Sequence, residues 1–214
     1  MNDKVLIGMR APEFTAKSTF GTIRLADFLG NWVVLFSHPG DFTPVCTTEF
    51  IAFSRAAKDF FDIGAQLLGL SIDSNKSHLA WVYAIEMSSG VRVPFPVISD
   101  RMGEIAKKYG MISPHLNHTE TVRNVYIIDP RGIIRAILIY PPSAGRNIEE
   151  ILRLIKSLQA TDSQGVVTPA NWQPGEAAML PAPDTYDKLV EREEQIENNY
   201  CDDWYLCYKN ENTN

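Results

Sequence analysis

The sequence predicts an α/β fold with a mixed central sheet, and three observations support this class. Short apolar runs alternate with helical patterns along residues 1–160. Two β-rich runs late in this region are joined by a Pro-containing turn, which is typical of a hairpin. Because the apolar runs are continuous rather than alternating, we expect both faces of the sheet to be covered. The 214 residues allow one domain with a substantial appendage.

The predicted elements of this domain follow in chain order. The run Trp32–Ser37 predicts a buried strand, and a loop rich in Pro and Gly follows it. Apolar residues at helical spacing then predict a helix that contains Phe50, Phe53, Ala57, Phe60 and Phe61. Later patterns predict strands at 65–72, 96–99, 122–128 and 132–140, and helices around 78–87 and 148–158.

Residues 161–214 differ in composition and form a predicted C-terminal arm. They contain four prolines, then an acidic helical pattern over 186–199 and an aromatic stretch over 200–208. A segment so short and so often broken by proline is not expected to fold alone. We expect it to pack on its own domain or on a neighbouring subunit, which favours a homo-oligomer.

Composition and charge exclude several function classes. The formal net charge is −6, which gives no basic surface for nucleic acid or an anionic membrane. No apolar run approaches the length of a membrane span, and the first residues do not form a signal peptide pattern. Three cysteines are too few for a disulfide-stabilised secreted scaffold and favour a reducing compartment, so we expect a cytoplasmic protein.

Cys46 lies where a Pro-containing loop meets the first turn of the predicted helix. Unpaired amide groups and the helix dipole make such a position favourable for a thiolate. Thr43 can bring a hydroxyl to the same point, and Pro44 can shield the sulfur without offering a proton donor. These features suit a nucleophile that attacks a small molecule. The alternative is a buried structural cysteine, because free cysteine is among the most buried residue types.

The nine residues DFTPVCTTE at 41–49 resemble the peroxidatic-cysteine motif of the peroxiredoxins. With the preceding residues 36–39, they are similar to the subgroup of 1-Cys enzymes and their archaeal and bacterial thioredoxin-peroxidase relatives. Further matches occur along almost the whole chain, from residues 8–14 to the C-terminal arm. The resemblance implies a thioredoxin-like fold, a peroxidase domain over 1–160, and an arm over 161–214 that provides dimerisation and a resolving cysteine.

The resemblance also implies roles for individual residues. Cys46 corresponds to the nucleophile, Thr43 to a hydrogen-bond partner of the peroxide and Pro44 to the shield of the site. Arg123 corresponds to the arginine that stabilises the thiolate and binds peroxide, and Glu49 is placed to orient it. Two further residues, Arg146 and His38, match positions of the subgroup and are predicted to contribute to substrate binding. Arg123 and Glu49 also have ordinary alternatives, a strand-edge arginine and a helix-dipole carboxylate.

The remaining cysteines lie in the arm. By resemblance, Cys207 is the resolving cysteine, which attacks the oxidised cysteine of the partner subunit, and Cys201 is an accessory thiol. The alternative is two buried structural thiols. A zinc site from both cysteines with His115 and His118 is disfavoured because Cys-x5-Cys does not match the usual ligand spacing. We therefore expect no metal and no other cofactor.

The predicted function is a thiol-dependent peroxidase that reduces hydrogen peroxide and organic hydroperoxides. It needs a thioredoxin-like or glutaredoxin-like dithiol donor. The resemblance implies a dimer, and in this subgroup often a ring of five dimers. The alternative is a thioredoxin-fold redox-sensing or chaperone module that does not sustain turnover. Asn31 stands where one relative has a lipase-type serine, so no lipase activity is expected.

Overall fold

The computed structural model describes residues 5–116, 119–194, 196 and 200–209. Its central element is a seven-stranded mixed sheet with the order β2-β1-β5-β4-β3-β6-β7. The strands are β1 (Thr15–Ser18), β2 (Gly21–Arg24), β3 (Trp32–Ser37), β4 (Ala65–Ser71), β5 (Val97–Ser99), β6 (Arg123–Ile128) and β7 (Ile134–Tyr140). β3, β4 and β5 are parallel, and β6 runs antiparallel to β3. The predicted α/β class is confirmed.

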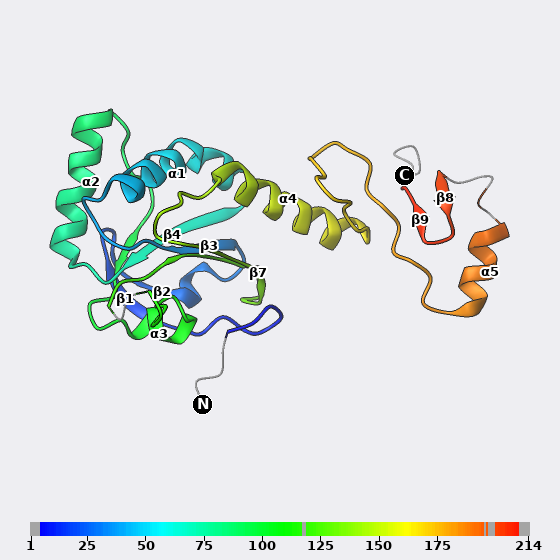
Figure 1. Ribbon diagram of the computed structural model, residues 1–214, viewed down its shortest axis with the longest axis horizontal. Coiled ribbons are helices and arrows are strands. Elements are labelled where there is room, and N and C mark those ends of the chain that lie inside the picture. The colour runs from blue at the N-terminus through cyan, green and yellow to red at the C-terminus, as the bar shows by residue number, and fades with distance from the viewer. Residues whose placement is uncertain (1–4, 117–118, 195, 197–199, 210–214) are drawn as a thin grey trace. The chain divides into compact units, whose positions relative to one another are not determined.

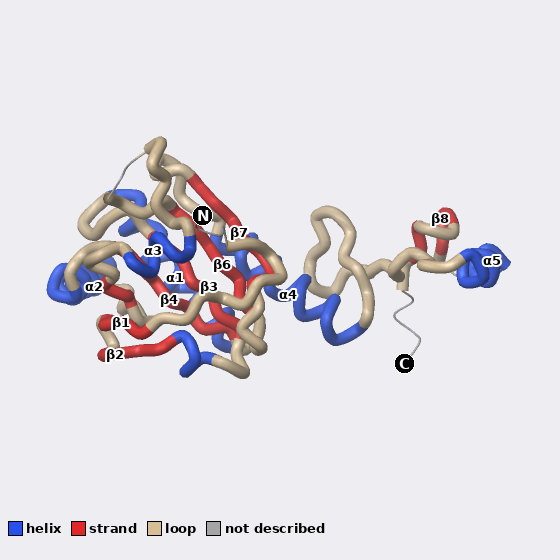
Figure 2. The backbone as a smooth tube through the Cα atoms, turned by 90° about the horizontal axis from the view of Figure 1, so that it is seen from below, coloured by secondary structure: helices blue, strands red, loops and turns tan. Residues whose placement is uncertain are grey.

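Helices cover both faces of this sheet. α1 (Pro44–Asp62) and α2 (Asn75–Ser89) lie on one side, and the short α3 (Glu104–Tyr109) lies on the other, as Figure 1 shows. Figure 2 shows β6, β3 and β4 next to one another, as their hydrogen-bonded ladders require. All six residues of β3 are buried, which explains why its sequence is continuously apolar. An apolar layer therefore lies between the sheet and the helices on each of its two faces.

The layer under α1 is aromatic. The Phe36 ring of β3 stacks on Phe53 at a centroid distance of 4.2 Å and meets Phe50 edge-on at 5.5 Å. Gly69 of β4 lies against these rings, and a Cβ atom there would be 3.1 Å from Cζ of Phe50. The close approach requires a residue without a side chain. This packing fixes α1, the helix that carries Cys46, against the sheet.

We expect Gly69→Ala to destabilise the protein because the new methyl group forces Phe50 and Phe36 to move. Overpacking of this kind costs about 1–3 kcal/mol of unfolding free energy. The matched control is Gly40→Ala, whose Cβ would find its nearest neighbours at 3.8 and 4.0 Å. Thermal unfolding of both variants measures the difference. Equal melting temperatures for Gly69→Ala and the unmodified protein would contradict this account.

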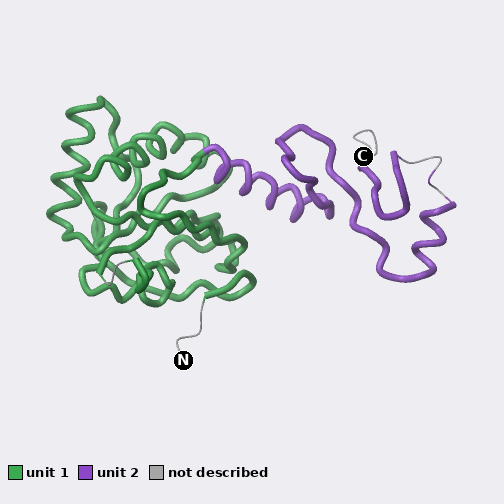
Figure 3. The backbone as a smooth tube through the Cα atoms, viewed as in Figure 1, with its two compact units in different colours: residues 1–148 green, residues 149–214 purple. Residues whose placement is uncertain are grey.

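The chain divides into two compact units, residues 1–148 and 149–214, which Figure 3 colours separately. α4 (Ile148–Gln164) begins at this boundary, and the second unit also contains α5 (Tyr186–Glu194), β8 (Cys201–Asp203) and β9 (Leu206–Cys207). β8 and β9 form an antiparallel hairpin. The residues around Met179 join them, because the N–H of Leu180 donates to the carbonyl of Cys207 at 2.8 Å. The C-terminal strand pair gives the arm local structure.

The sequence patterns located most of these elements. The hairpin of β6 and β7 is present, with its turn at residues 129–133. β1, β2, α3 and the 3-10 turn Leu25–Phe28 were not predicted, since each is too short to show a periodic pattern. The acidic helix predicted over 186–199 ends at Glu194, and its last residues fall largely outside the described part of the chain. Within the described residues, no helix is long and apolar enough to cross a membrane.

Candidate active site

Cys46 lies in the first turn of α1 and its side chain is buried. β3 ends at Ser37, and a short loop leads to Thr43, which has extended backbone angles and serves as the N-cap residue. Pro44 occupies the first helical position, where the missing N–H costs nothing and the fixed φ favours a helix. The predicted position of Cys46 at a helix start is thus confirmed.

The Thr43 hydroxyl does not cap the helix. It donates instead to the carbonyl of Gly40 at 2.9 Å, while the Thr43 carbonyl accepts from the N–H of Thr47 at 3.0 Å. The first-turn amides of α1 therefore donate no hydrogen bond to this side chain, and such amides are suited to an oxygen-bearing ligand. Pro44 is exposed beside them, so its shielding role remains a prediction.

Arg123 brings a cation to the sulfur. It is the first residue of β6, the neighbour of β3, and its Nη1 atom lies 3.3 Å from Sγ of Cys46. The same atom donates to Oε2 of Glu49 at 2.7 Å. Nε and Nη2 donate to the carbonyl of Pro142 at 3.1 and 2.8 Å. With three acceptors around it, the guanidinium has one fixed orientation toward the cysteine.

Glu49 lies one turn after Cys46 and contacts a second arginine. The Arg146 guanidinium donates to both carboxylate oxygens, at 2.8 Å from Nε and 2.6 Å from Nη2. Its backbone N–H also donates to Oε1 at 2.9 Å. Nη1 donates to the carbonyls of Ser37 and Asn124, so the side chain is fully engaged and buried. Burial lowers the pKa of Arg146, although Glu49 opposes that shift.

The charges of these four residues are unbalanced when the cysteine is a thiol. Two guanidiniums share one carboxylate, and the side chains of Arg123, Arg146 and Glu49 are all at most 3% exposed. A thiolate at Cys46 restores neutrality in this buried site. Because an uncompensated buried charge is costly, the site is suited to one further negative charge beside Arg123.

His38 belongs to a neighbouring buried cluster. Its Nε2 lies 3.1 Å from Oδ1 of Asp41, and its ring stacks on Trp81. Burial lowers the pKa of His38, which Asp41 partly offsets. The other nitrogen, Nδ1, has no hydrogen-bond partner among the described residues. The predicted substrate contact of His38 remains untested.

His78 completes this cluster on the other side of Asp41. The ligand atoms of His38, Asp41 and His78 lie within 4.8 Å of one another, close enough together to hold a metal ion. The imidazole–carboxylate contacts within the cluster have hydrogen-bond length. His118, which the disfavoured zinc site would use, lies outside the described residues.

Comparison with known proteins gives a consistent result. Residues 7–137 match the AhpC/TSA family, and residues 157–195 match the C-terminal domain of 1-Cys peroxiredoxin. Peroxiredoxin 2 of Caldanaerobacter subterraneus subsp. tengcongensis is 56% identical over 95% of this chain and 92% of its own. The chain belongs to the peroxiredoxin family. Peroxiredoxins are thiol-dependent peroxidases, and this one carries the buried cysteine and arginine expected of such an enzyme.

Two solved structures resemble this peroxiredoxin along nearly its whole length. A cysteine-to-serine mutant of peroxiredoxin 6 from Arenicola marina has a TM-score of 0.86 and 36% identity, covering 98% of this chain and all of its own. A yeast mitochondrial 1-Cys peroxiredoxin has a TM-score of 0.83 and 38% identity, covering 96% of this chain and 99% of its own. Its structure concerns thiol resolution via glutathione/thioredoxin systems. The thioredoxin-like fold is therefore confirmed.

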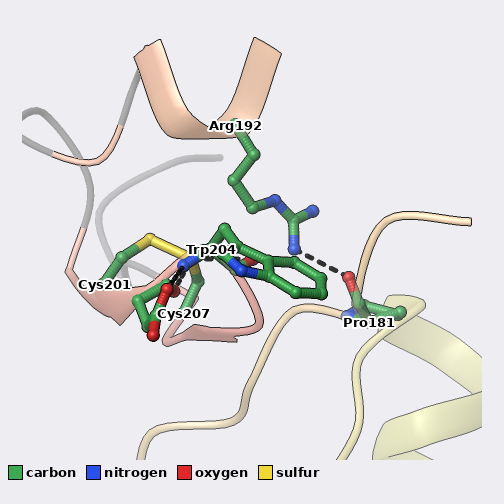
Figure 4. Close-up of a disulfide and its surroundings, with 6 residues drawn as sticks. Pro181, Arg192, Cys201, Trp204 and Cys207 are labelled. Atoms are coloured by element: carbon green, nitrogen blue, oxygen red, sulfur yellow. Dashed lines mark hydrogen bonds between the residues drawn. A yellow bond between two sulfur atoms is a disulfide. The ribbon is translucent and has the colours of Figure 1, made fainter. Parts of the chain in front are cut away.

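The two arm cysteines of this peroxiredoxin form a disulfide with each other. Figure 4 shows this bond between β8 and β9, whose register places Cys201 opposite Cys207. Beside it, Arg192 of α5 donates to the carbonyl of Pro181 at 2.8 Å. The sequence predicts both cysteines as thiols, because their pairing depends on a hairpin that its pattern does not reveal. Cys46 is free.

Sequence reasoning missed Asp41 and His78. Asp41 stands inside the recognised motif but was given no role. His78, Trp81 and Ile85 are the buried residues of α2, at helical spacing. A histidine in an otherwise apolar stripe is the signal that could have identified it. Arg123, Glu49 and Cys46 were predicted, and the structure brings all three together.

Proposed function

We propose that this chain reduces hydrogen peroxide and organic hydroperoxides through Cys46. The observation that supports this most is the position of Arg123 Nη1, 3.3 Å from the Cys46 sulfur and 2.7 Å from Glu49. This donor stabilises the thiolate before reaction and the peroxide oxygens as charge develops on them. Thr43, at the N-cap, supplies a hydroxyl that contacts the second peroxide oxygen.

The first chemical step is a nucleophilic displacement on oxygen. The Cys46 thiolate attacks the terminal oxygen of the hydroperoxide, a sulfur–oxygen bond forms and the oxygen–oxygen bond breaks. The leaving oxygen takes up a proton and departs as water or an alcohol. Cys46 is thereby oxidised to a sulfenic acid and the peroxide is reduced by two electrons. Arg146 supports this step indirectly by holding Glu49, and both Arg146 and His38 are proposed to contribute to substrate binding.

Resolution of the sulfenic acid is assigned to Cys207 of the partner subunit. The Cys207 thiolate attacks the sulfenic sulfur, hydroxide leaves as water after protonation, and a disulfide joins the two subunits. The Cys201 thiolate then attacks Cys207 and releases Cys46 as a thiolate. This exchange produces the disulfide seen in the arm, and the contact of the two strands supports it. An external dithiol reduces that disulfide and completes the cycle.

The proposed partners follow from this cycle. A thioredoxin-like or glutaredoxin-like protein is the proposed electron donor, and the subject of the yeast structure supports that choice. The proposed assembly is a dimer, in a ring of five dimers. β7 is an outer strand of the sheet with Ile139 exposed, which supports pairing with a second copy. A cytoplasmic location remains a prediction from the cysteine content.

The test is a trapping experiment on the reduced protein. After one equivalent of hydrogen peroxide, Cys201→Ser is expected to accumulate a Cys46–Cys207 disulfide, visible as a dimer on a non-reducing gel and in a peptide map. The unmodified protein is expected to pass on to the Cys201–Cys207 disulfide. Cys207→Ser serves as the matched control, in which Cys46 is oxidised but no dimer forms.

Steady-state turnover gives a second measure. With a thioredoxin-like donor, Cys207→Ser is expected to lower peroxide turnover at least about tenfold, because sulfenic acid then awaits an external thiol. It also increases conversion of Cys46 to sulfinic acid. Full turnover by Cys207→Ser would show that the arm thiols are structural. Loss of only one equivalent of peroxide by the unmodified protein with excess dithiothreitol would favour the sensor alternative.

A further inference from the structure

A buried polar cluster lies behind the loop that leads to Cys46. We propose that Asp41, held between His38 and His78, is a positioning residue that fixes this loop in the conformation in which Cys46 reacts with peroxide. The role rests on the proposed peroxidase function, since it concerns the reactivity of Cys46. Asp41 acts through the loop backbone and makes no contact with peroxide in this proposal.

Asp41 is a buried carboxylate with imidazole partners. Its side chain is 1% exposed, and both histidine side chains are fully buried. His38 Nε2 lies 3.1 Å from Oδ1, while His78 Nδ1 lies 3.0 and 2.9 Å from the two carboxylate oxygens. Burial opposes ionisation of Asp41, but the hydrogen bonds from the two imidazoles outweigh it and hold the pKa of Asp41 well below its usual range. Loss of either imidazole partner would leave the buried Asp41 carboxylate without compensation, which is energetically costly.

Both ring nitrogens of His78 lie at hydrogen-bond distance from an oxygen atom. Nε2 lies 3.2 Å from the carbonyl oxygen of Ile98, which can only accept a hydrogen bond. Nδ1 faces the Asp41 carboxylate, which also accepts. Both ring nitrogens of His78 are therefore engaged, Nδ1 by the Asp41 carboxylate and Nε2 by a backbone carbonyl. His78 thus connects the active-site loop to α2 and β5.

Backbone hydrogen bonds also hold the loop at His38 and Asp41. The N–H of Asp41 donates to Oδ2 of Asp73 at 3.0 Å, and that oxygen also accepts from the Ser71 hydroxyl at 2.7 Å. The N–H of His38 donates to the carbonyl of Leu70 at 2.9 Å. Residues 38 and 41 are thus bound to the end of β4 and the turn that follows it. Asp41 is the last residue held by these bonds, and the segment from Phe42 to Cys46 follows it directly.

The next residue, Phe42, is strained. Its φ is 55°, in the left-handed region that residues other than glycine rarely adopt, and its side chain is 61% exposed. Burial of the Phe42 side chain therefore does little to offset the strain. The anchoring of Asp41 offsets it instead, and the chain then enters Thr43 and the first turn of α1. The strain at Phe42 favours opening of the loop directly before Thr43 and the first turn of α1. The hydrogen bonds of Asp41 oppose that opening.

Trp81 of α2 connects the same cluster to the reactive turn itself. Its ring stacks on His38 at a centroid distance of 5.0 Å, and its Nε1 donates to the Thr47 hydroxyl at 3.2 Å. Thr47 directly follows Cys46 in α1. Loss of the Asp41 anchor therefore favours local opening of the loop and first turn. Opening slows the reaction with peroxide, and it speeds the encounter of oxidised Cys46 with a resolving thiol.

Two measurements on Asp41→Asn test this role, a rate constant and a peroxide concentration. The rate constant for oxidation of reduced Cys46 by hydrogen peroxide is expected to fall about 10- to 100-fold, as for loss of a charged hydrogen bond. The peroxide concentration that half-converts Cys46 to sulfinic acid during turnover is expected to rise about tenfold or more, because opening favours resolution over further oxidation. Phe42→Gly, added to Asp41→Asn, is expected to recover the oxidation rate severalfold, since glycine adopts this φ without strain.

Asp129→Asn is the matched control. Asp129 is also a buried carboxylate, in the β6–β7 turn, where it accepts from two backbone N–H groups. Its replacement should lower stability without changing the sulfinic midpoint. The proposal is overturned when Asp41→Asn reacts within twofold of the unmodified protein, or when both variants change alike. His78→Gln repeats the test if Asp41→Asn does not fold. Unreactive Cys46 in the unmodified protein would instead refute the peroxidase function.

Discussion

Cys46→Ser is expected to abolish peroxide reduction, lowering the rate at least about 10³-fold, because a serine hydroxyl at neutral pH is not ionised and is a far weaker nucleophile than a thiolate. The structural change is small, since the buried oxygen can still accept from Arg123, which lies 3.3 Å from the present sulfur. The loss therefore reports chemistry rather than misfolding. Peroxide consumption with excess dithiothreitol measures it directly.

Two controls make this result decisive. Cys201→Ser and Cys207→Ser change the arm thiols and are expected to retain stoichiometric oxidation by peroxide, because Cys46 and its surroundings are intact. Circular dichroism of Cys46→Ser checks that the fold is retained. If Cys46→Ser still consumed peroxide at the rate of the unmodified protein, another residue would be the nucleophile and the proposed mechanism would be wrong.

Glu49→Gln is expected to give the largest loss of stability. Its carboxylate accepts from both Arg123 and Arg146, and the three side chains are almost completely buried. Removing the negative charge leaves two buried guanidiniums without a compensating carboxylate, which costs about 3–5 kcal/mol of unfolding free energy. For a chain of this size, that corresponds to a decrease in melting temperature of about 10 °C.

The same substitution at Glu150 is the matched control. Glu150 pairs with Arg153 in α4, but its side chain is 38% exposed, so water solvates the arginine after the change. We expect little change in the melting temperature of Glu150→Gln. Calorimetry on both variants compares a buried with a partly exposed carboxylate. Similar melting temperatures would mean that Glu49 is not essential to the buried charge balance.

The sequence predicted those parts of the fold that depend on local pattern. β3 and β4 are buried on both faces, so their apolar residues are continuous and easily recognised. β1 and β2 have four residues each and many exposed positions, so no periodicity identifies them. α3 has six residues between two glycines with positive φ, too short for an amphipathic pattern.

The active site was predictable where a motif carried it. Cys46 and its neighbours occur in one continuous segment, and Arg123 was found through the resemblance. The backbone partners of the two arginines were not predictable, because they come from distant parts of the chain. Pro142 supplies a carbonyl to Arg123, and Ser37 supplies one to Arg146. Likewise, the Cys201–Cys207 bond required knowledge of a hairpin register that no turn signal announces.

Glu49 shared between two arginines limits how this site can be altered or transplanted. Arg123 and Arg146 are 74 and 97 residues from Glu49 along the chain, yet each contacts the same carboxylate. Changing any one of the three alters the charge and the hydrogen bonding of a buried site that the other two share, so their substitutions should be strongly non-additive. Grafting the nine-residue segment into another scaffold would therefore not transfer its reactivity. Transfer of the reactivity would also require an arginine on the neighbouring strand and a second arginine from the loop before α4.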